Sequence, residues 1–162
     1  MQSALAKTLL EIIEDEPDGC ANVVQFVRLT PTAKCPTYGS AGAAGLDLYA
    51  DEAVEILGGD RALIKCGIAM ALPAFTVGQV CSRSGLALKR GIGVLTGTFD
   101  ADYRGELHVL LFNTSGKRFR VEVGDRIAQM VITPVISVRM REKLRLDTTE
   151  RGAGGYGSTG LR

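Results

Sequence analysis

The sequence predicts an all-β protein, a single antiparallel domain built as a sandwich, a barrel or a jelly roll. From Val23 onward, short segments rich in β-branched and apolar residues alternate with Gly, Pro, Asn and Asp. The clearest segment, 118–123, alternates apolar with charged side chains, as a strand with one buried face does. A chain of 162 residues that is 46% hydrophobic and 23% charged is long enough for one domain with a substantial core.

The first residues predict a different element. Leu5, Leu9, Ile12 and Ile13 recur at helical spacing, and Glu-Pro-Asp-Gly at 16–19 ends the pattern. Residues 1–22 are therefore expected to form an N-terminal arm or helix.

Short strands dominate the rest of the chain. The predicted strands are 23–29, 46–56, 62–72, 76–83, 106–113, 118–123, 126–133 and 135–143. One short internal helix, from Ser84 to Arg90, follows a strand directly. We expect a β domain over 23–144 and a mobile C-terminal tail over 145–162.

Composition excludes several classes of partner. The formal net charge of +1 provides no global basic field, so binding of duplex nucleic acid or of an anionic membrane is not expected. No apolar run approaches the roughly 20 residues that span a bilayer, and acidic residues between 11 and 16 occupy the place of a secretion signal. The four cysteines form no C-x-x-C pair, which favours free thiols in a reducing, intracellular compartment, the cytoplasm or the nucleus.

The glycine-rich segment 151–160 has the residue types that wrap a nucleoside triphosphate. Its five glycines let the backbone approach an anion, and Arg151 offers a forked cation. Ser158 and Thr159 offer hydroxyl donors, and the ring of Tyr156 can lie flat on a base. A frayed, disordered terminus explains the glycines equally well.

Two internal segments have residues suited to binding phosphate. Arg83, Ser84 and Gly85 stand where a strand gives way to the predicted helix, so a hydroxyl, backbone N–H groups and a guanidinium can face one anion. A serine that only caps the helix explains the same residues. Gln129 interrupts an apolar strand, either on the solvent face or inward with a polar partner such as a phosphate oxygen.

The segment 97–105 is a polar turn that holds Asp100 and Asp102 between two apolar strands. A plain β-turn would look similar. Such a turn requires neither Phe99 nor Tyr103, however, and a carboxylate beside a phosphate can take a proton from water as a general base.

These pieces together resemble the trimeric dUTP pyrophosphatases, the dUTPase family, from Val23 to Gly160. The five family motifs appear in order: Ala44-Gly45-Leu46-Asp47-Leu48-Tyr49-Ala50, Arg83-Ser84-Gly85-Leu86-Ala87, Gly97-Thr98-Phe99-Asp100-Ala101-Asp102-Tyr103-Arg104-Gly105, Gly124-Asp125-Arg126 through Ala128-Gln129, and Arg151-Gly152-Ala153-Gly154-Gly155-Tyr156-Gly157-Ser158-Thr159-Gly160. Five motifs with family-like spacing are highly specific.

The resemblance implies a jelly-roll or distorted-barrel subunit in a homotrimer, with active sites at subunit interfaces that the tail closes. The implied activity is that of a dUTP diphosphatase, which hydrolyses dUTP to dUMP and pyrophosphate. That activity limits uracil incorporation into DNA and supplies dUMP for dTMP synthesis. The implied cofactor is Mg²⁺, held by the substrate phosphates and water, with Asp47 touching its water shell at most.

The resemblance also implies residue roles. Asp100 activates the attacking water, Tyr103 packs under the deoxyribose, and a strand pair around Leu95 to Phe99 accepts uracil, while Asp102 is a bystander. The implied substrate-binding residues are Arg83, Ser84, Gly85, Gly97, Thr98, Phe99, Tyr103, Gln129, Arg151, Tyr156, Gly157, Ser158 and Thr159.

Some positions depart from the family pattern. Ser82 stands where a proline is usual, and Val94 stands where several bacterial members carry a uracil-binding asparagine. His108, the single histidine, is expected on the surface or at an interface. The alternative functions are a dCTP deaminase-like activity, whose branch works with a glutamate in a different hairpin, and a non-enzymatic regulator on the same fold.

Overall fold

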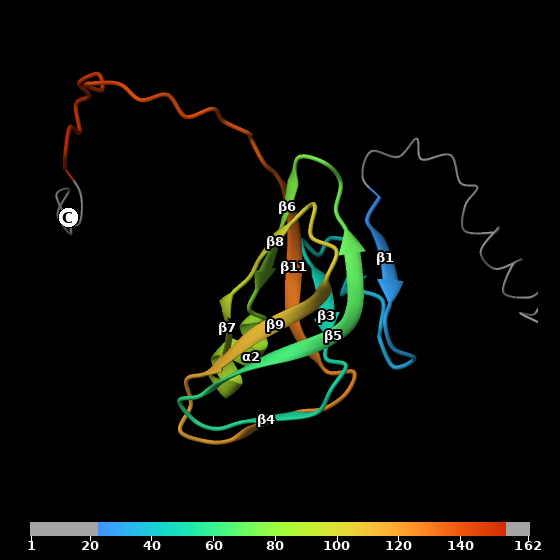
Figure 1. Ribbon diagram of the computed structural model, residues 1–162. Coiled ribbons are helices and arrows are strands. Elements are labelled where there is room, and N and C mark those ends of the chain that lie inside the picture. The colour runs from blue at the N-terminus through green and yellow to red at the C-terminus, as the bar shows by residue number, and fades with distance from the viewer. Residues whose placement is uncertain (1–22, 155–162) are drawn as a thin grey trace, which may run out of the picture.

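The computed structural model describes residues 23–154 (Figure 1). The expected N-terminal arm or helix, 1–22, and residues 155–162 lie outside the described residues. The described elements are β1 (Gln25–Arg28), β2 (Thr37–Tyr38), β3 (Leu46–Tyr49), β4 (Val54–Ile56), β5 (Arg61–Ala71), β6 (Thr76–Cys81), α2 (Ser84–Arg90), β7 (Ile92–Thr96), β8 (Thr98–Asp100), β9 (Glu106–Asn113), β10 (Phe119–Val121) and β11 (Arg126–Pro134).

The strands form two larger sheets and one small one. The four-stranded sheet has the order β1-β5-β9-β7, the five-stranded sheet the order β2-β3-β11-β6-β8, and β10 pairs with β4 alone. Every strand pair is antiparallel. An all-β, jelly-roll-like arrangement with one short helix confirms the predicted fold class.

The core lies between the two larger sheets, because its side chains come from both. In β9, buried residues alternate strictly with half-buried ones, so one face of this strand packs into the core. The largest fully buried side chains are Leu48, Ile56, Ile64, Ile68, Ile92, Leu107, Leu111, Ile127, Met130, Val109, Val121 and Asn113.

The predicted helix over Ser84 to Arg90 is confirmed as α2. It ends at Gly91, which adopts a left-handed φ of 67° and donates its N–H to the carbonyls of Ala87 and Leu86. This seven-residue helix is the one helix that the structure describes, and no described helix is long and apolar enough to cross a membrane.

Two strand predictions are wrong. The segment 46–56 is two strands, because the chain bends after Tyr49: β3 pairs with β11, whereas β4 pairs with β10. The segment 135–143 forms no strand, because it leaves the body of the domain without a neighbouring strand (Figure 1). Its apolar side chains remain exposed, Ile136 to 86% and Met140 to 93%.

The described cysteines, Cys35, Cys66 and Cys81, are free thiols, as the sequence predicts for these three. Cys66 is buried on β5. Burial raises the pKa of the Cys66 thiol to about 12, and the carboxylates of Glu106 and Asp51 add to the rise.

We predict that Cys66 resists a thiol reagent in the native protein, while Cys35 and Cys81 react, because both are partly exposed. Mass spectrometry after labelling at neutral pH, with and without denaturant, measures the difference. The raised pKa also means that stability contributed by the neutral thiol is complete below the ordinary value of 9.0 and is lost as pH rises through 12. Rapid native labelling of Cys66 would contradict its burial.

Candidate active site

The turn between β8 and β9 brings Asp100 and Tyr103 together. The backbone N–H of Tyr103 donates to the carbonyl of Asp100 at 3.2 Å. The ring of Tyr103 meets Phe99 edge-on, with centroids 5.3 Å apart and planes at 85°. A Cβ at position 105 would overlap the Tyr103 side chain, so a larger residue here would have to displace that ring.

A cavity of about 220 Å³ opens at this turn. Its lining residues are Thr98, Phe99, Asp100, Tyr103, Glu106, Leu107 and His108. The structure therefore gathers four of the predicted site residues, with the exposed carboxylate of Asp100 among them. Such a carboxylate can accept a proton from a water molecule bound beside it.

Gly97 explains how the chain reaches this cavity. It separates β7, which pairs with β9, from β8, which pairs with β6, so the chain changes sheets here. The N–H of Val80 donates to the Gly97 carbonyl at 2.6 Å, and a Cβ on Gly97 would lie 2.5 Å from the Val80 carbonyl oxygen. The strands expected around Leu95 to Phe99 are thus present, but they pair with different sheets and not with each other.

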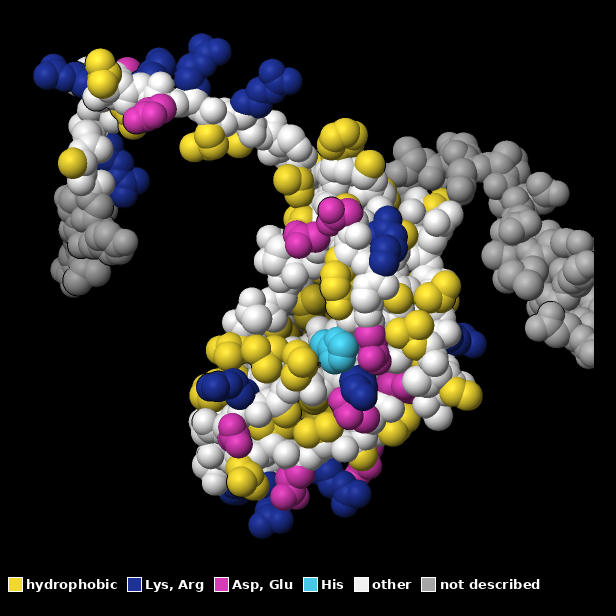
Figure 2. Space-filling view, viewed as in Figure 1, with side chains coloured by type: hydrophobic (Ala, Val, Ile, Leu, Met, Phe, Trp, Pro, Cys, Tyr) yellow, Lys and Arg dark blue, Asp and Glu magenta, His cyan; other side chains and the backbone are white. Residues whose placement is uncertain are grey.

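Sequence reasoning missed Glu106 and His108 as lining residues. The Nδ1 of His108 lies 2.9 Å from the Glu106 carbonyl oxygen, and its Nε2 lies 3.7 Å from the Glu106 carboxylate. Figure 2 shows the histidine in cyan on the surface beside acidic side chains. The available signal was the alternation of β9, which turns both residues outward from the core.

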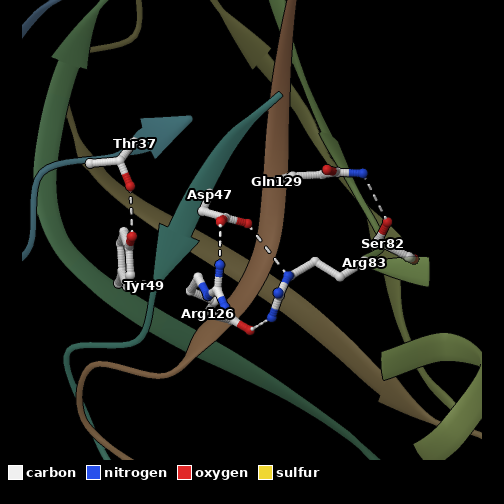
Figure 3. A network of polar contacts seen from close by, with 7 residues as sticks. All are labelled: Thr37, Asp47, Tyr49, Ser82, Arg83, Arg126 and Gln129. Atoms are coloured by element: carbon white, nitrogen blue, oxygen red, sulfur yellow. Dashed lines mark hydrogen bonds and ion pairs between the residues drawn. The ribbon is translucent and has the colours of Figure 1, made fainter. Parts of the chain in front are cut away.

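A second polar cluster surrounds Asp47 on β3 (Figure 3). Asp47 is only 8% exposed, and its carboxylate is shared by two guanidinium groups. The Nε of Arg83 lies 3.4 Å from Oδ1, and the Nη1 of Arg126 lies 3.1 Å from Oδ2. The Nη1 of Arg83 also donates to the Arg126 carbonyl at 2.7 Å. Together these contacts fix the direction of the Arg83 side chain.

The strand β11 contributes to this cluster through an irregularity. Its pairing with β3 shifts register between Arg126 and Ala128. Such a bulge turns backbone groups and side chains away from the regular ladder, which is consistent with the Arg126 carbonyl accepting a side-chain hydrogen bond. Arg126 itself was not a predicted site residue, although it belongs to the same motif as Gln129.

The other predicted phosphate-binding residues lie around α2. Gln129 is half-buried, and its Nε2 donates to the Ser82 carbonyl at 3.3 Å, which supplies the polar partner that an inward glutamine requires. Ser84 and Gly85 are exposed at the start of α2. The residue at the N-cap is Arg83, with no side-chain capping bond, so the interpretation of Ser84 as an N-cap is wrong.

The two clusters lie at opposite ends of β6. Asp100 pairs with Val77 near the start of this strand, whereas Gln129 pairs with Cys81 at its end. Arg83 stands six positions after Val77 in extended backbone. A strand rises about 3.3 Å per residue, so the backbones at Val77 and Arg83 are roughly 20 Å apart. One chain therefore does not bring Asp100 and the predicted phosphate-binding residues together.

The C-terminal arm, residues 135–154, extends away from the body of the domain (Figure 1). The Nε of Arg151 donates to the Gly154 carbonyl at 2.9 Å, within the arm itself. Tyr156, Gly157, Ser158 and Thr159 lie outside the described residues.

The fold and these clusters define a class of protein: a jelly-roll-like β domain with an exposed carboxylate at one end of a strand and oriented arginines at the other. The model of the dUTPase family matches residues 32–160. The chain belongs to the dUTPase family.

Individual relatives agree with this assignment. The chain is 49% identical to the deoxyuridine 5′-triphosphate nucleotidohydrolase of Candida albicans, over 81% of this chain and 84% of that protein. It is 47% identical to that of Rattus norvegicus, over 85% of this chain and 67% of that protein. A mutant dUTPase of Staphylococcus bacteriophage 80alpha, solved with dUpNHpp, superimposes with a TM-score of 0.82 at 27% identity, over 86% of this chain and 99% of that chain.

We predict that Asp47→Ala lowers the free energy of unfolding by about 1–3 kcal/mol, because it leaves two guanidinium groups without their shared carboxylate. Urea unfolding followed by circular dichroism measures the change. Asp47→Asn keeps a side-chain acceptor and should lose less. Equal unfolding midpoints for wild type and Asp47→Ala would show that the ion pairs contribute nothing to stability.

Proposed function

We propose that this protein hydrolyses dUTP to dUMP and pyrophosphate, with Mg²⁺, in active sites that form between the chains of a homotrimer. Membership of the dUTPase family supports the reaction. The observation that carries the proposal is the cavity that holds Asp100 and Tyr103.

In the proposed reaction Asp100 takes a proton from a bound water molecule. The water oxygen forms a bond to the α-phosphorus, and the bond from that phosphorus to the oxygen bridging it to the β-phosphorus breaks. Pyrophosphate leaves with the electron pair. The exposure of Asp100 supports this role, since water reaches its carboxylate directly.

Tyr103 supplies the selection for deoxyribose. Its ring is held by the edge contact with Phe99 and by the hydroxyl, which donates to the Glu106 carbonyl at 3.2 Å. A sugar packed on a ring held in this way has no space for a 2′-hydroxyl, so UTP is rejected. Thr98 and Gly97, in the same segment, belong to the proposed uracil pocket.

Arg83, Ser84, Gly85 and Gln129 bind the phosphates in this proposal, and Arg151 joins them from the arm. An arginine whose direction is already fixed loses less conformational entropy when it binds phosphate. The ion pair of Arg83 with Asp47 therefore supports its role.

In this proposal the Mg²⁺ ion is bound mainly by the substrate and not by side chains of the protein. Both carboxylate oxygens of Asp47 already face arginines, and residues 23–154 contain no group of three His, Cys, Asp or Glu side chains that could hold a metal. Mg²⁺ would be held by the triphosphate oxygens and water, and it would neutralise negative charge on the phosphates.

Assembly of the site from several chains follows from the separation along β6. Asp100 and Arg83 lie at opposite ends of this strand, so a second chain has to bring its Arg83 to the Asp100 of the first. The C-terminal arm supports the same proposal, because this segment, 135–154, extends away from the body of its own chain (Figure 1).

A panel of nucleotides tests the reaction. With Mg²⁺ present, we expect pyrophosphate release from dUTP and little from UTP, dTTP or dCTP, with no ammonia from dCTP. Asp100→Asn should lower turnover by about 10²–10⁴-fold while dUTP still binds, because it removes the base and keeps the shape. Ammonia from dCTP would favour the deaminase alternative, and wild-type turnover in Asp100→Asn would exclude Asp100 as the base.

Mixing two inactive variants tests the assembly. Asp100→Asn and Arg83→Ala chains, co-refolded in equal amounts, should regain about one quarter of the wild-type activity if each site pairs Asp100 of one chain with Arg83 of the next. The separately refolded variants are the control. If each site used a single chain, the mixture would remain as inactive as its components.

A further inference from the structure

A second cavity, of about 360 Å³, lies beside α2 and away from the cavity that holds Asp100. It is formed by α2, β10 and the start of β11. Its lining residues are Arg83, Leu86, Arg90, Phe119, Arg120, Asp125, Arg126 and Ile127. Four guanidinium groups and one carboxylate therefore face a space large enough for a small polyanion.

The carboxylates near this cavity are fewer than the arginines that line it. Asp47 is the partner of both Arg83 and Arg126, so one carboxylate serves two guanidinium groups. Arg120 is paired with Glu122 at 2.5 Å, but its side chain is 71% exposed. Arg90 has no partner within residues 23–154.

The single carboxylate of the lining has its own partner. Asp125 accepts a hydrogen bond from the backbone N–H of Glu122 at 2.9 Å, within the turn before β11. This bond holds the carboxylate in the turn. Among the four lining arginines, Arg90 is the one without an acidic partner in residues 23–154, whereas the other three share the carboxylates of Asp47 and Glu122.

The floor of the cavity is fixed by the core. Ile127 is 2% exposed, and Leu86 and Phe119 pack against the buried cluster. Side chains held in this way form a rigid apolar base beneath the cationic rim, so a ligand is recognised through the guanidinium groups. Planar, forked guanidinium groups match phosphate oxygens in pairs.

We propose that this arginine-lined cavity binds pyrophosphate, the inorganic product, as it leaves the active site. The inference rests on the proposed function, because Arg83 belongs to both the substrate phosphate site and this cavity. Arg83 contacts the anion in the substrate phosphate site and again in the cavity beside α2. In that cavity Arg90, Arg120 and Arg126 also bind it. The cavity is thus a product subsite that makes pyrophosphate an inhibitor of the enzyme.

The test uses a double variant of the two outer arginines, Arg90→Gln with Arg120→Gln. A matched control, Lys89→Gln with Arg118→Gln, removes the same charge from α2 and from the start of the β10 segment, but neither residue lines the cavity. Isothermal titration calorimetry with pyrophosphate, in the full-length protein at fixed Mg²⁺ and ionic strength, measures binding. Inhibition of dUTP cleavage by pyrophosphate is the second readout.

We expect the double variant to bind pyrophosphate about tenfold more weakly, with an equal rise in its inhibition constant, because two exposed charge contacts are lost. The control should remain within about twofold of wild type, the effect of general charge alone. Equal weakening in both variants would overturn the subsite. An altered oligomeric state confined to the Arg90 and Arg120 variant would also overturn it and identify the cavity as a contact between chains.

The result separates the subsite from the proposed function. Pyrophosphate binding that depends on Arg90 and Arg120, in a protein that cleaves no dUTP, would sustain an anion site and reject the reaction. Selective dUTP cleavage with pyrophosphate binding unaffected by both residues would sustain the reaction and reject the subsite.

Discussion

The length of one extended strand governs how this protein can work. β6 holds Asp100 beside its first residues through the pairing with β8, and it leads into Arg83 at its other end. Backbone hydrogen bonds on both sides, to β8 and β11, prevent the strand from folding back. The backbones at Asp100 and at Arg83, the predicted phosphate-binding arginine, are therefore kept roughly 20 Å apart. Chemistry that needs both groups therefore needs two chains.

Charge distribution reinforces this division. At the Arg83 end, the nearly buried carboxylate of Asp47 contacts two arginines. These contacts fix the directions of both guanidinium groups, and the end carries a net positive charge. At the Asp100 end the cavity is lined by carboxylates and one histidine. In the proposed active site, an anionic substrate would bind the arginine end of one chain and meet Asp100 of a neighbouring chain. The arginine-lined cavity beside α2 extends the first end, which gives the inorganic product a cationic surface on the side remote from Asp100.

Much of the fold was predictable because it depends on local alternation of apolar and polar residues. β9 was located to the residue, and so was α2, because the first is a largely apolar segment that begins after Gly105 and the second ends before Gly91. The segment 135–143 shows the limit of that reasoning. Its apolar and β-branched residues satisfy the local pattern of a strand, but a strand also requires a neighbour, and within the described chain this segment has none. The local sequence pattern of a segment does not show whether another strand lies beside it.

The sequence by itself determined the all-β class, the positions of most strands and the residues with the right chemistry, because residue type and spacing are local properties. It also grouped Thr98, Phe99, Asp100 and Tyr103, which are neighbours along the chain. Only the tertiary structure decided that Arg83 and Arg126 share Asp47, that His108 faces the same cavity as Asp100, and that the two clusters are apart. Those facts depend on strand register and on a sheet change at Gly97, where the backbone packs directly against Val80. Contacts between residues distant in sequence arise from packing, and the spacing of residues along a chain does not encode them individually.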